Sequence, residues 1–118
     1  FDLYAMHKKN KADGIISVCK VECPVEWCNT LPEDGSMKNF LSPDISSKRS
    51  QDLPERYRIN GAIYIVKTNR FIKEKTFFIT DNIYAYTMER SSSVDIDDEF
   101  DLQFAEFLLL RQKNALRS

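Results

Sequence analysis

An aspartate–glycine pair followed by a β-branched run constrains the fold of this chain more than any other feature. Asp13 and Gly14 close a lysine-rich segment, and residues 15–22 open with Ile-Ile and then alternate between apolar and polar side chains. Such a run is typical of a strand that enters a sheet from its buried part. Residues 1–11 have the spacing of the last turns of an amphipathic helix, and their lysines suit the helix dipole. Helix, stop and buried strand, in that order, predict an α/β fold with a parallel sheet.

The remainder of the chain predicts further strands and helices. We predict strands over residues 59–66 and 83–88, a short strand end over 94–97, and helices over 68–74 and about 98–112. One apolar stripe follows the last helix: Phe100, Phe104, Phe107 and Leu108. A chain of 118 residues is long enough for one domain.

The middle of the chain has a different character. Residues 27–31 and 37–41 stand on either side of a Pro-Glu-Asp-Gly turn and carry the apolar side chains Trp27, Leu31, Met37, Phe40 and Leu41, which predicts a β-hairpin. Residues 42–56 are polar and predict an exposed loop. Because a lone hairpin is marginally stable in water and two-fold dimers are the commonest closed assembly, we expect a second copy to cover its apolar face. We expect that interface to include Trp27 and Phe40.

Composition excludes several classes of function. The formal net charge is -1, so the basic excess that is usual for binding nucleic acid or a membrane surface is missing. No apolar run approaches the ~20 residues that span a bilayer, and no signal peptide is recognisable. Cys19, Cys23 and Cys28 are an odd set without the spacing of a zinc site, which favours reduced thiols in the cytoplasm. His7 is the only histidine, which excludes a histidine-based triad built from this chain alone.

Two aspartates before the last helix are candidate metal ligands. In an extended segment Asp95 and Asp97 share one face, while Ile96 points to the core. Two carboxylates at a strand end can hold a hard divalent cation such as Mg²⁺. The alternative is that the acidic run caps the helix that follows, through Asp97, Asp98, Glu99 and Asp101.

Arginines and aromatic residues supply two weaker signals. The polar loop carries Arg49 and Arg56 toward Gly61, and guanidinium groups suit carboxylate or phosphate ligands. The alternative is a solvated loop before a core strand. Phe77 and Phe78 are adjacent, so in an extended segment they face opposite ways and one of them is free to line a pocket.

Four segments agree in order and spacing with one known family: residues 12–19 (Ala-Asp-Gly-Ile-Ile-Ser-Val-Cys), 51–54 (Gln-Asp-Leu-Pro), 57–65 (Tyr-Arg-Ile-Asn-Gly-Ala-Ile-Tyr-Ile) and 93–97 (Ser-Val-Asp-Ile-Asp). The chain resembles the acylneuraminate cytidylyltransferases, or CMP-sialic acid synthetases, over nearly its whole length. The resemblance implies the C-terminal part of a Rossmann-like nucleotide-diphospho-sugar transferase fold of three layers, with a protruding β-hairpin dimerisation arm at about residues 23–58. It also implies transfer of a cytidylyl group from CTP to a sialic-type nine-carbon sugar acid, with release of pyrophosphate and with Mg²⁺ as cofactor.

The resemblance implies roles for individual residues. Asp95 and Asp97 match the metal-binding aspartates of the family, and a bound Mg²⁺ neutralises charge during attack on a phosphate. The residues assigned to substrate binding are Tyr64, Phe77 and Phe78, which match the aromatic lining of the sugar-acid pocket, together with Asn60, Arg49 and Gln51. No catalytic residue is assigned within this chain.

Two departures from the family leave alternatives open. The glycine-rich motif that holds the CTP phosphates is absent, so we expect the chain on its own to be inactive. Ser50 stands where the family often has a basic residue. The alternatives are the same chemistry on legionaminic or pseudaminic acid, and a non-catalytic dimerising fragment. We expect a cytoplasmic homodimer that binds neither nucleic acid nor membrane.

Overall fold

The computed structural model describes Ala5 and residues 11–117, arranged as two compact units. One unit contains the chain up to Cys19 and from Ile59 onward, and the other contains Lys20–Arg58. The helix expected over residues 1–11, with His7, falls almost entirely outside the described residues. No helix among those described is both long and apolar enough to cross a membrane.

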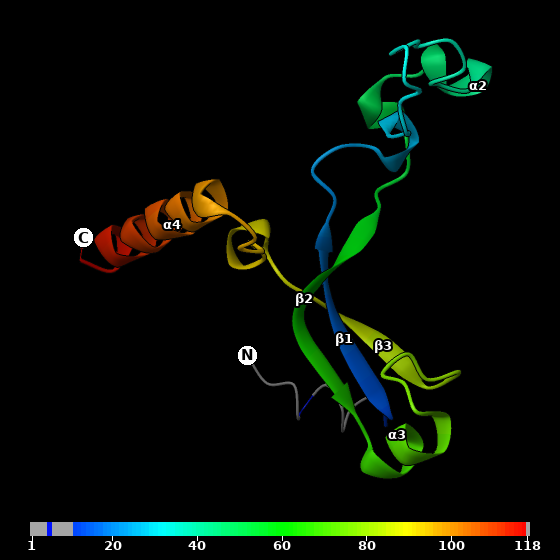
Figure 1. The fold of residues 1–118 in the computed structure, drawn as a ribbon. Coiled ribbons are helices and arrows are strands. Elements are labelled where there is room, and N and C mark those ends of the chain that lie inside the picture. The colour runs from blue at the N-terminus through cyan, green and yellow to red at the C-terminus, as the bar shows by residue number, and fades with distance from the viewer. Residues whose placement is uncertain (1–4, 6–10, 118) are drawn as a thin grey trace. The chain divides into compact units, whose positions relative to one another are not determined.

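The first unit is built on a sheet of three strands in the order β2-β1-β3 (Figure 1). The strands are β1 (Gly14–Lys20), β2 (Tyr57–Val66) and β3 (Ile83–Thr87). β1 and β3 are parallel, with paired residues from Gly14↔Ile83 to Val18↔Thr87. This confirms the α/β class and the parallel pairing that the first strand predicted.

β2 runs antiparallel to β1, as the hydrogen bonds at both ends of the pair indicate. The Lys67 N–H, just after β2, donates to the carbonyl of Asp13, just before β1, at 2.8 Å. At the other end, the Val21 N–H donates to the carbonyl of Arg56 at 3.0 Å. The sheet is therefore mixed, with β1 at its centre, and the prediction of a parallel sheet holds only for the pair β1 and β3.

The central position of β1 explains why its sequence is so apolar. Ile15 and Cys19 are fully or almost fully buried, and Ile16 is 6% exposed. A strand between two neighbours and covered on both faces reads as a continuous apolar run. Gly14 is closely packed, because a Cβ atom there would lie 3.2 Å from Ile79 Cδ1 and 3.3 Å from Ile83 Cγ1, and these side chains would have to shift slightly to admit it.

Two helices follow the predicted positions. α3 spans Thr68–Glu74, as predicted, and ends where Lys75 adopts a left-handed conformation with φ of 56°. α4 spans Glu99–Arg117 and is longer than predicted. Its apolar stripe is largely uncovered by the described residues, since Phe100 is 75% exposed and Phe107 is 54% exposed.

The strand end predicted over residues 94–97 is wrong. The 3₁₀ turn η3 (Arg90–Ser92) redirects the chain after β3, and residues 93–97 form no strand. Ile96 is 53% exposed and does not point to a core. A short extended segment becomes a strand only where a neighbouring strand offers its backbone groups, and none of the described strands does so here.

The hairpin predicted in the second unit is also wrong, although its turn is present. The Gly35 N–H donates to the carbonyl of Pro32 at 2.9 Å, but the flanking segments 27–31 and 37–41 form no strands. The unit contains only short turns: η1 (Val25–Trp27), α2 (Pro43–Ser46) and η2 (Ser50–Asp52). The backbone–backbone hydrogen bonds described between residues 24 and 53 join residues three or four apart, so they form turns and no strand ladder.

Candidate functional site

Three buried polar side chains join the sheet to the segment that carries the aspartates. Ser17 on β1, Asn60 on β2 and Ser93 after β3 are 0%, 8% and 3% exposed. The Asn60 amide oxygen accepts from Ser17 Oγ at 2.5 Å, and its amide nitrogen donates to Ser93 Oγ at 2.9 Å. Ser93 Oγ donates in turn to the carbonyl of Glu89 at 2.6 Å. We call these three residues the buried polar network.

The local backbone at Asn60 places its side chain in this network. Gly61 has φ of 73°, a conformation that favours glycine. The Ala62 N–H donates to the Asn60 amide oxygen at 3.2 Å, and the Ile63 N–H donates to Ser17 Oγ at 2.8 Å. The amide of Asn60 is thus bonded within the protein on both its oxygen and its nitrogen. The role of Asn60 in substrate binding stays a prediction. The contacts show that its side chain links β1, β2 and the segment after β3.

The buried polar network lies toward the carboxyl ends of the parallel strands. The Met88 N–H, just after β3, donates to the carbonyl of Val18 near the end of β1 at 2.8 Å. The chain then passes through η3 to Ser93 and on to Asp95. In open α/β sheets this end of the strands is where ligands bind.

The acidic run divides between two roles. The Asp101 carboxylate accepts from the backbone N–H groups of Asp97 and Asp98, at 3.1 and 3.3 Å, and Asp98 Oδ1 accepts from the Asp101 N–H at 2.9 Å. Asp98 and Asp101 therefore cap α4. The carboxylates of Asp95 and Asp97 take no part in this cap and are exposed.

Asp95 and Asp97 fit a magnesium ion only in part. In the described part of the chain no group of three or more histidine, cysteine or acidic side chains is placed to hold a metal. Mg²⁺ is commonly bound by one or two carboxylates together with substrate phosphates and water. The two exposed aspartates are compatible with that donor set, and the rest of the set must come from substrate and solvent.

The predicted aromatic residues come together beside β2. The ring centroids of Tyr64 and Phe77 are 5.8 Å apart, and those of Tyr64 and Phe78 are 6.1 Å apart. The expectation that Phe77 and Phe78 face opposite ways is wrong, because the chain bends there and both rings approach Tyr64. Sequence reasoning missed Phe71 on α3, whose ring centroid is 5.1 Å from that of Phe77.

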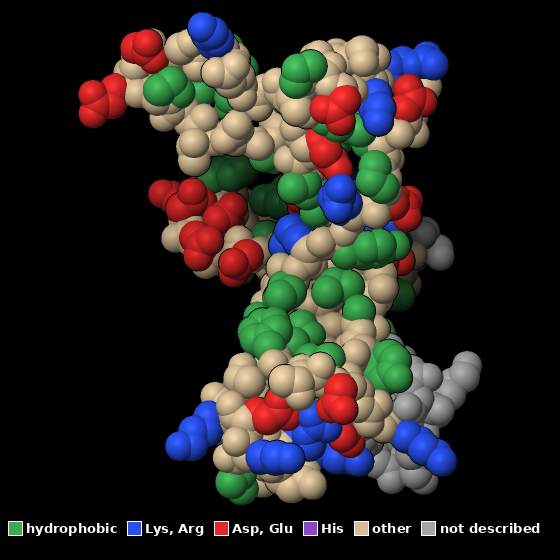
Figure 2. Space-filling view, turned by 90° about the vertical axis from the view of Figure 1, so that its right-hand side faces the viewer, with side chains coloured by type: hydrophobic (Ala, Val, Ile, Leu, Met, Phe, Trp, Pro, Cys, Tyr) green, Lys and Arg blue, Asp and Glu red, His purple; other side chains and the backbone are tan. Residues whose placement is uncertain are grey.

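This aromatic cluster, made of Tyr64, Phe71, Phe77 and Phe78, is open to solvent. Phe78 is 54% exposed, and Tyr64 is 38% exposed. Figure 2 shows groups of hydrophobic side chains (green) exposed on the surface. Exposed rings in contact with one another offer a surface on which an apolar part of a ligand can stack.

Arg49 and Gln51 belong to the second unit. Arg49 is exposed and pairs with Asp52 over 3.6 Å, and Gln51 lies in η2. Arg56 is also engaged within this unit, because it pairs with Glu26 over 2.6 Å. The arginines of the loop are thus accounted for by ion pairs in the described part of the chain.

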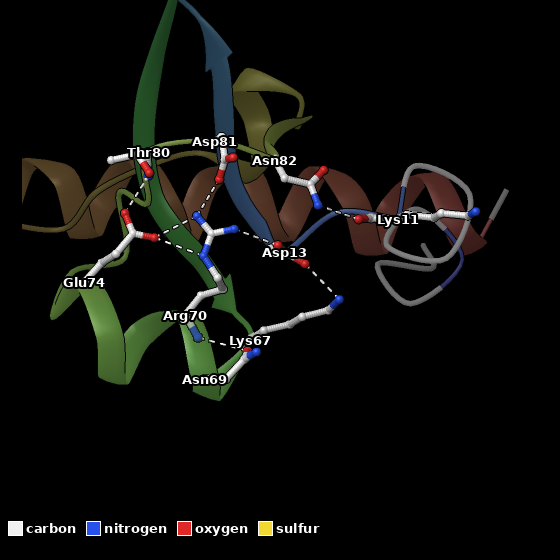
Figure 3. Close-up of polar contacts among 9 residues, drawn as sticks. All are labelled: Lys11, Asp13, Lys67, Asn69, Arg70, Glu74, Thr80, Asp81 and Asn82. Atoms are coloured by element: carbon white, nitrogen blue, oxygen red, sulfur yellow. Dashed lines mark hydrogen bonds and ion pairs between the residues drawn. The ribbon is translucent and has the colours of Figure 1, made fainter.

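An ion-pair cluster around Arg70 stands at the amino ends of β1 and β3 (Figure 3). The Arg70 guanidinium pairs with Glu74 and Asp13, each over 2.7 Å, and with Asp81 over 2.5 Å. Lys67 approaches the other oxygen of Asp13 at 2.8 Å. The hydrogen bond from Lys67, aided by Asn82 and Arg70, lowers the pKa of Asp13 to about 2. The cluster joins α3 to the start of the sheet and has no predicted role in catalysis.

We expect Asp13→Asn to flatten the acid limb of the stability profile. A carboxyl whose pKa falls on folding stabilises the protein above its unfolded value of 3.8, and that contribution disappears as the pH falls toward about 2. Denaturant unfolding followed across this range should show wild type losing more stability than the variant. Lys67→Met removes the largest cause of the lowered pKa of Asp13 and should also reduce the loss of stability at acidic pH. Parallel profiles for wild type and Asp13→Asn would contradict this assignment.

Comparison with known proteins gives similarity over most of the chain. It is 33% identical over 95 residues to the N-acylneuraminate cytidylyltransferase of Streptococcus agalactiae serotype V, which covers 80% of this chain and 22% of the relative. It is 32% identical over 103 residues to the N-acylneuraminate cytidylyltransferase of Escherichia coli O18:K1:H7, covering 87% and 23%. It is 26% identical over 105 residues to the CMP-N,N'-diacetyllegionaminic acid synthase of Legionella pneumophila, covering 87% and 44%. No family model matches the chain.

The first two of these relatives are named cytidylyltransferases, which are nucleotidyltransferases. The chain belongs to the acylneuraminate cytidylyltransferase family, as the resemblance predicted. It spans about a fifth of the length of the streptococcal relative and less than half the length of the Legionella relative.

Proposed function

We propose that the protein containing this chain transfers a cytidylyl group from CTP to a sialic-type nine-carbon sugar acid, with release of pyrophosphate. The observation that carries the proposal is the 33% identity to a named N-acylneuraminate cytidylyltransferase over 80% of the chain. The similarity to a diacetyllegionaminic acid synthase supports legionaminic acid as the second candidate acceptor. The proposed fold of the whole protein is a three-layer Rossmann-like one, and the proposed compartment is the cytoplasm.

We assign Asp95 and Asp97 to a magnesium ion that is shared with the substrate phosphates. When bound, the ion neutralises the charge that develops on the phosphate oxygens during transfer. This chain would supply two exposed carboxylates to the ion. Asp98 and Asp101 start α4 directly after them, and Ser93 fixes the segment to Asn60.

We assign Tyr64, Phe77 and Phe78 to the sugar-acid side of the site. Their exposed rings contact one another and can bury the apolar ring face and acyl group of a sugar acid. Arg49 and Gln51, in the second unit, are also proposed to bind substrate, because a guanidinium group suits a carboxylate ligand.

The experiment that tests the function is an assay of the full-length protein with CTP, Mg²⁺ and either N-acetylneuraminic or legionaminic acid. We expect a CMP-sugar and pyrophosphate in equal amounts, with one acceptor strongly preferred. Phe78→Ala should raise the KM for the sugar acid roughly tenfold, as expected from losing the burial of one aromatic ring, and leave the KM for CTP nearly unchanged. Absence of CMP-sugar with every nine-carbon acid tried would favour the non-catalytic alternative.

We also propose that the second unit, Lys20–Arg58, forms a homodimer interface. No residue of this unit is buried, and Trp27, Leu31 and Met37 are 41%, 64% and 61% exposed. Apolar side chains at that exposure need a partner surface, and a two-fold copy is the simplest one.

The double variant Trp27→Asp/Phe40→Asp should be monomeric, because two charges in an apolar interface would lose their hydration on association. Light scattering of the full-length protein measures the molar mass, which should be that of a dimer for wild type and that of a monomer for the double variant. Glu33→Asp, a conservative change at the exposed turn, is the control and should stay dimeric. A monomeric wild type, or a double variant that remains fully dimeric, contradicts the proposal.

A further inference from the structure

Two exposed thiols face each other across the first turn of the second unit. Cys23 Sγ and Cys28 Sγ are 3.9 Å apart, and both side chains are exposed. The backbone between them is held by the turn η1, in which the Trp27 N–H donates to the carbonyl of Pro24 and the Cys28 N–H to that of Val25, each at 3.0 Å. The third cysteine, Cys19, is fully buried on β1.

Two features make this pair suited to a disulfide rather than to a metal. A structural zinc site needs four ligands, and the described residues offer no group of three or more metal-binding side chains. A disulfide needs two cysteines only, and it forms when their sulfurs close from 3.9 Å to about 2 Å with the Cα atoms no more than about 7 Å apart. The hydrogen bond to Cys28 raises the pKa of Cys23, which lowers the fraction of attacking thiolate at neutral pH.

We propose that Cys23 and Cys28 form a reversible intramolecular disulfide by exchange with a low-molecular-weight disulfide such as oxidised glutathione. One cysteine thiolate attacks the oxidant, forms a mixed disulfide and releases one thiol. The second cysteine then attacks the protein sulfur of that mixed disulfide and releases the second thiol. Two electrons pass from the protein thiols to the oxidant, and the two protons of the cysteines end on the released thiols. The bridge closes a ring around η1 that contains Trp27.

The test is incubation of the protein with excess oxidised glutathione, followed by alkylation of the remaining thiols, proteolysis and mass spectrometry. We expect a peptide linked between Cys23 and Cys28 that lacks two hydrogen atoms, with Cys19 alkylated only after unfolding. Cys23→Ser and Cys28→Ser should each lose the internal link and retain a glutathione adduct on the remaining exposed thiol. Cys19→Ser should form the bridge as wild type does, and dithiothreitol should reverse it.

Three results would overturn the proposal: a wild-type protein in which both thiols stay reduced, one that carries glutathione without an internal link, or a bridge that includes Cys19. The result for the wild-type protein tests the proposal even if the cysteine variants fail to fold. Because it records a covalent bond and not CMP-sugar formation, its outcome is independent of the proposed function.

Discussion

Asp97→Asn in the full-length protein should lower the turnover number by at least about a hundredfold, while the melting temperature stays within a degree or so of wild type. The large effect follows from the proposed magnesium site, since an amide is a weaker ligand for a hard cation than a carboxylate. The small effect on stability follows from the structure, because the Asp97 side chain is exposed and the cap of α4 uses other groups. Steady-state kinetics over a range of Mg²⁺ concentrations, with a thermal melt, measures both quantities.

Asp98→Asn is the matched control for this experiment. It makes the same chemical change one residue away, on the side chain that caps α4. Asparagine caps helices about as well as aspartate does, so we expect both activity and stability close to wild type. Near-normal, Mg²⁺-dependent activity in Asp97→Asn would contradict the assignment of Asp97 as a magnesium ligand, whatever the control shows.

Asn60→Ala should cost about 2–3 kcal/mol of unfolding free energy. The variant removes the Asn60 amide donor from Ser93 Oγ and the nearer of two acceptors from Ser17 Oγ, which keeps the Ile63 carbonyl at 3.3 Å, and both serines are buried. Buried polar groups that lose their partners pay the cost of desolvation without compensation. Denaturant unfolding monitored by circular dichroism gives the change.

Asn114→Ala serves as the control for Asn60→Ala, because Asn114 is exposed on α4. Alanine has the higher helix propensity, so the control should be neutral or slightly stabilising. A second variant, Ser93→Ala, should lose less stability than Asn60→Ala, since it removes one member at the edge of the network. Equal stabilities of wild type and Asn60→Ala would show that the buried polar network does not support the fold.

Local sequence was sufficient to predict an element whose hydrogen bonds or burial pattern can be recognised within its own segment. α3 lies over the residues predicted, because a helix forms its hydrogen bonds within its own segment. β1 was recognisable because burial on both faces leaves a continuous apolar run. The α/β class followed from these elements, and so did the parallel pairing of β1 with β3.

Local sequence failed where a second segment decides the outcome. Residues 27–31 and 37–41 carry apolar side chains on either side of an observed turn, yet they form no strands. The segment with Asp95 and Asp97 was expected to be extended with Ile96 inward, and it is instead an exposed connection held by Ser93. A strand forms only where a neighbouring strand hydrogen-bonds its backbone groups, and the sequence of one strand does not specify which segment that neighbour is.

The sequence by itself determined which residue types are available for chemistry: two aspartates before a capped helix, a set of aromatic side chains and an asparagine before a glycine. Only the tertiary structure decided how they combine. It brought Tyr64, Phe77 and Phe78 together, engaged Asn60 with Ser17 and Ser93, and gave the cap of α4 to Asp98 and Asp101. The physical reason is that residue type and periodicity act along the chain, whereas the burial of polar groups and the contacts of rings depend on segments brought together by the sheet.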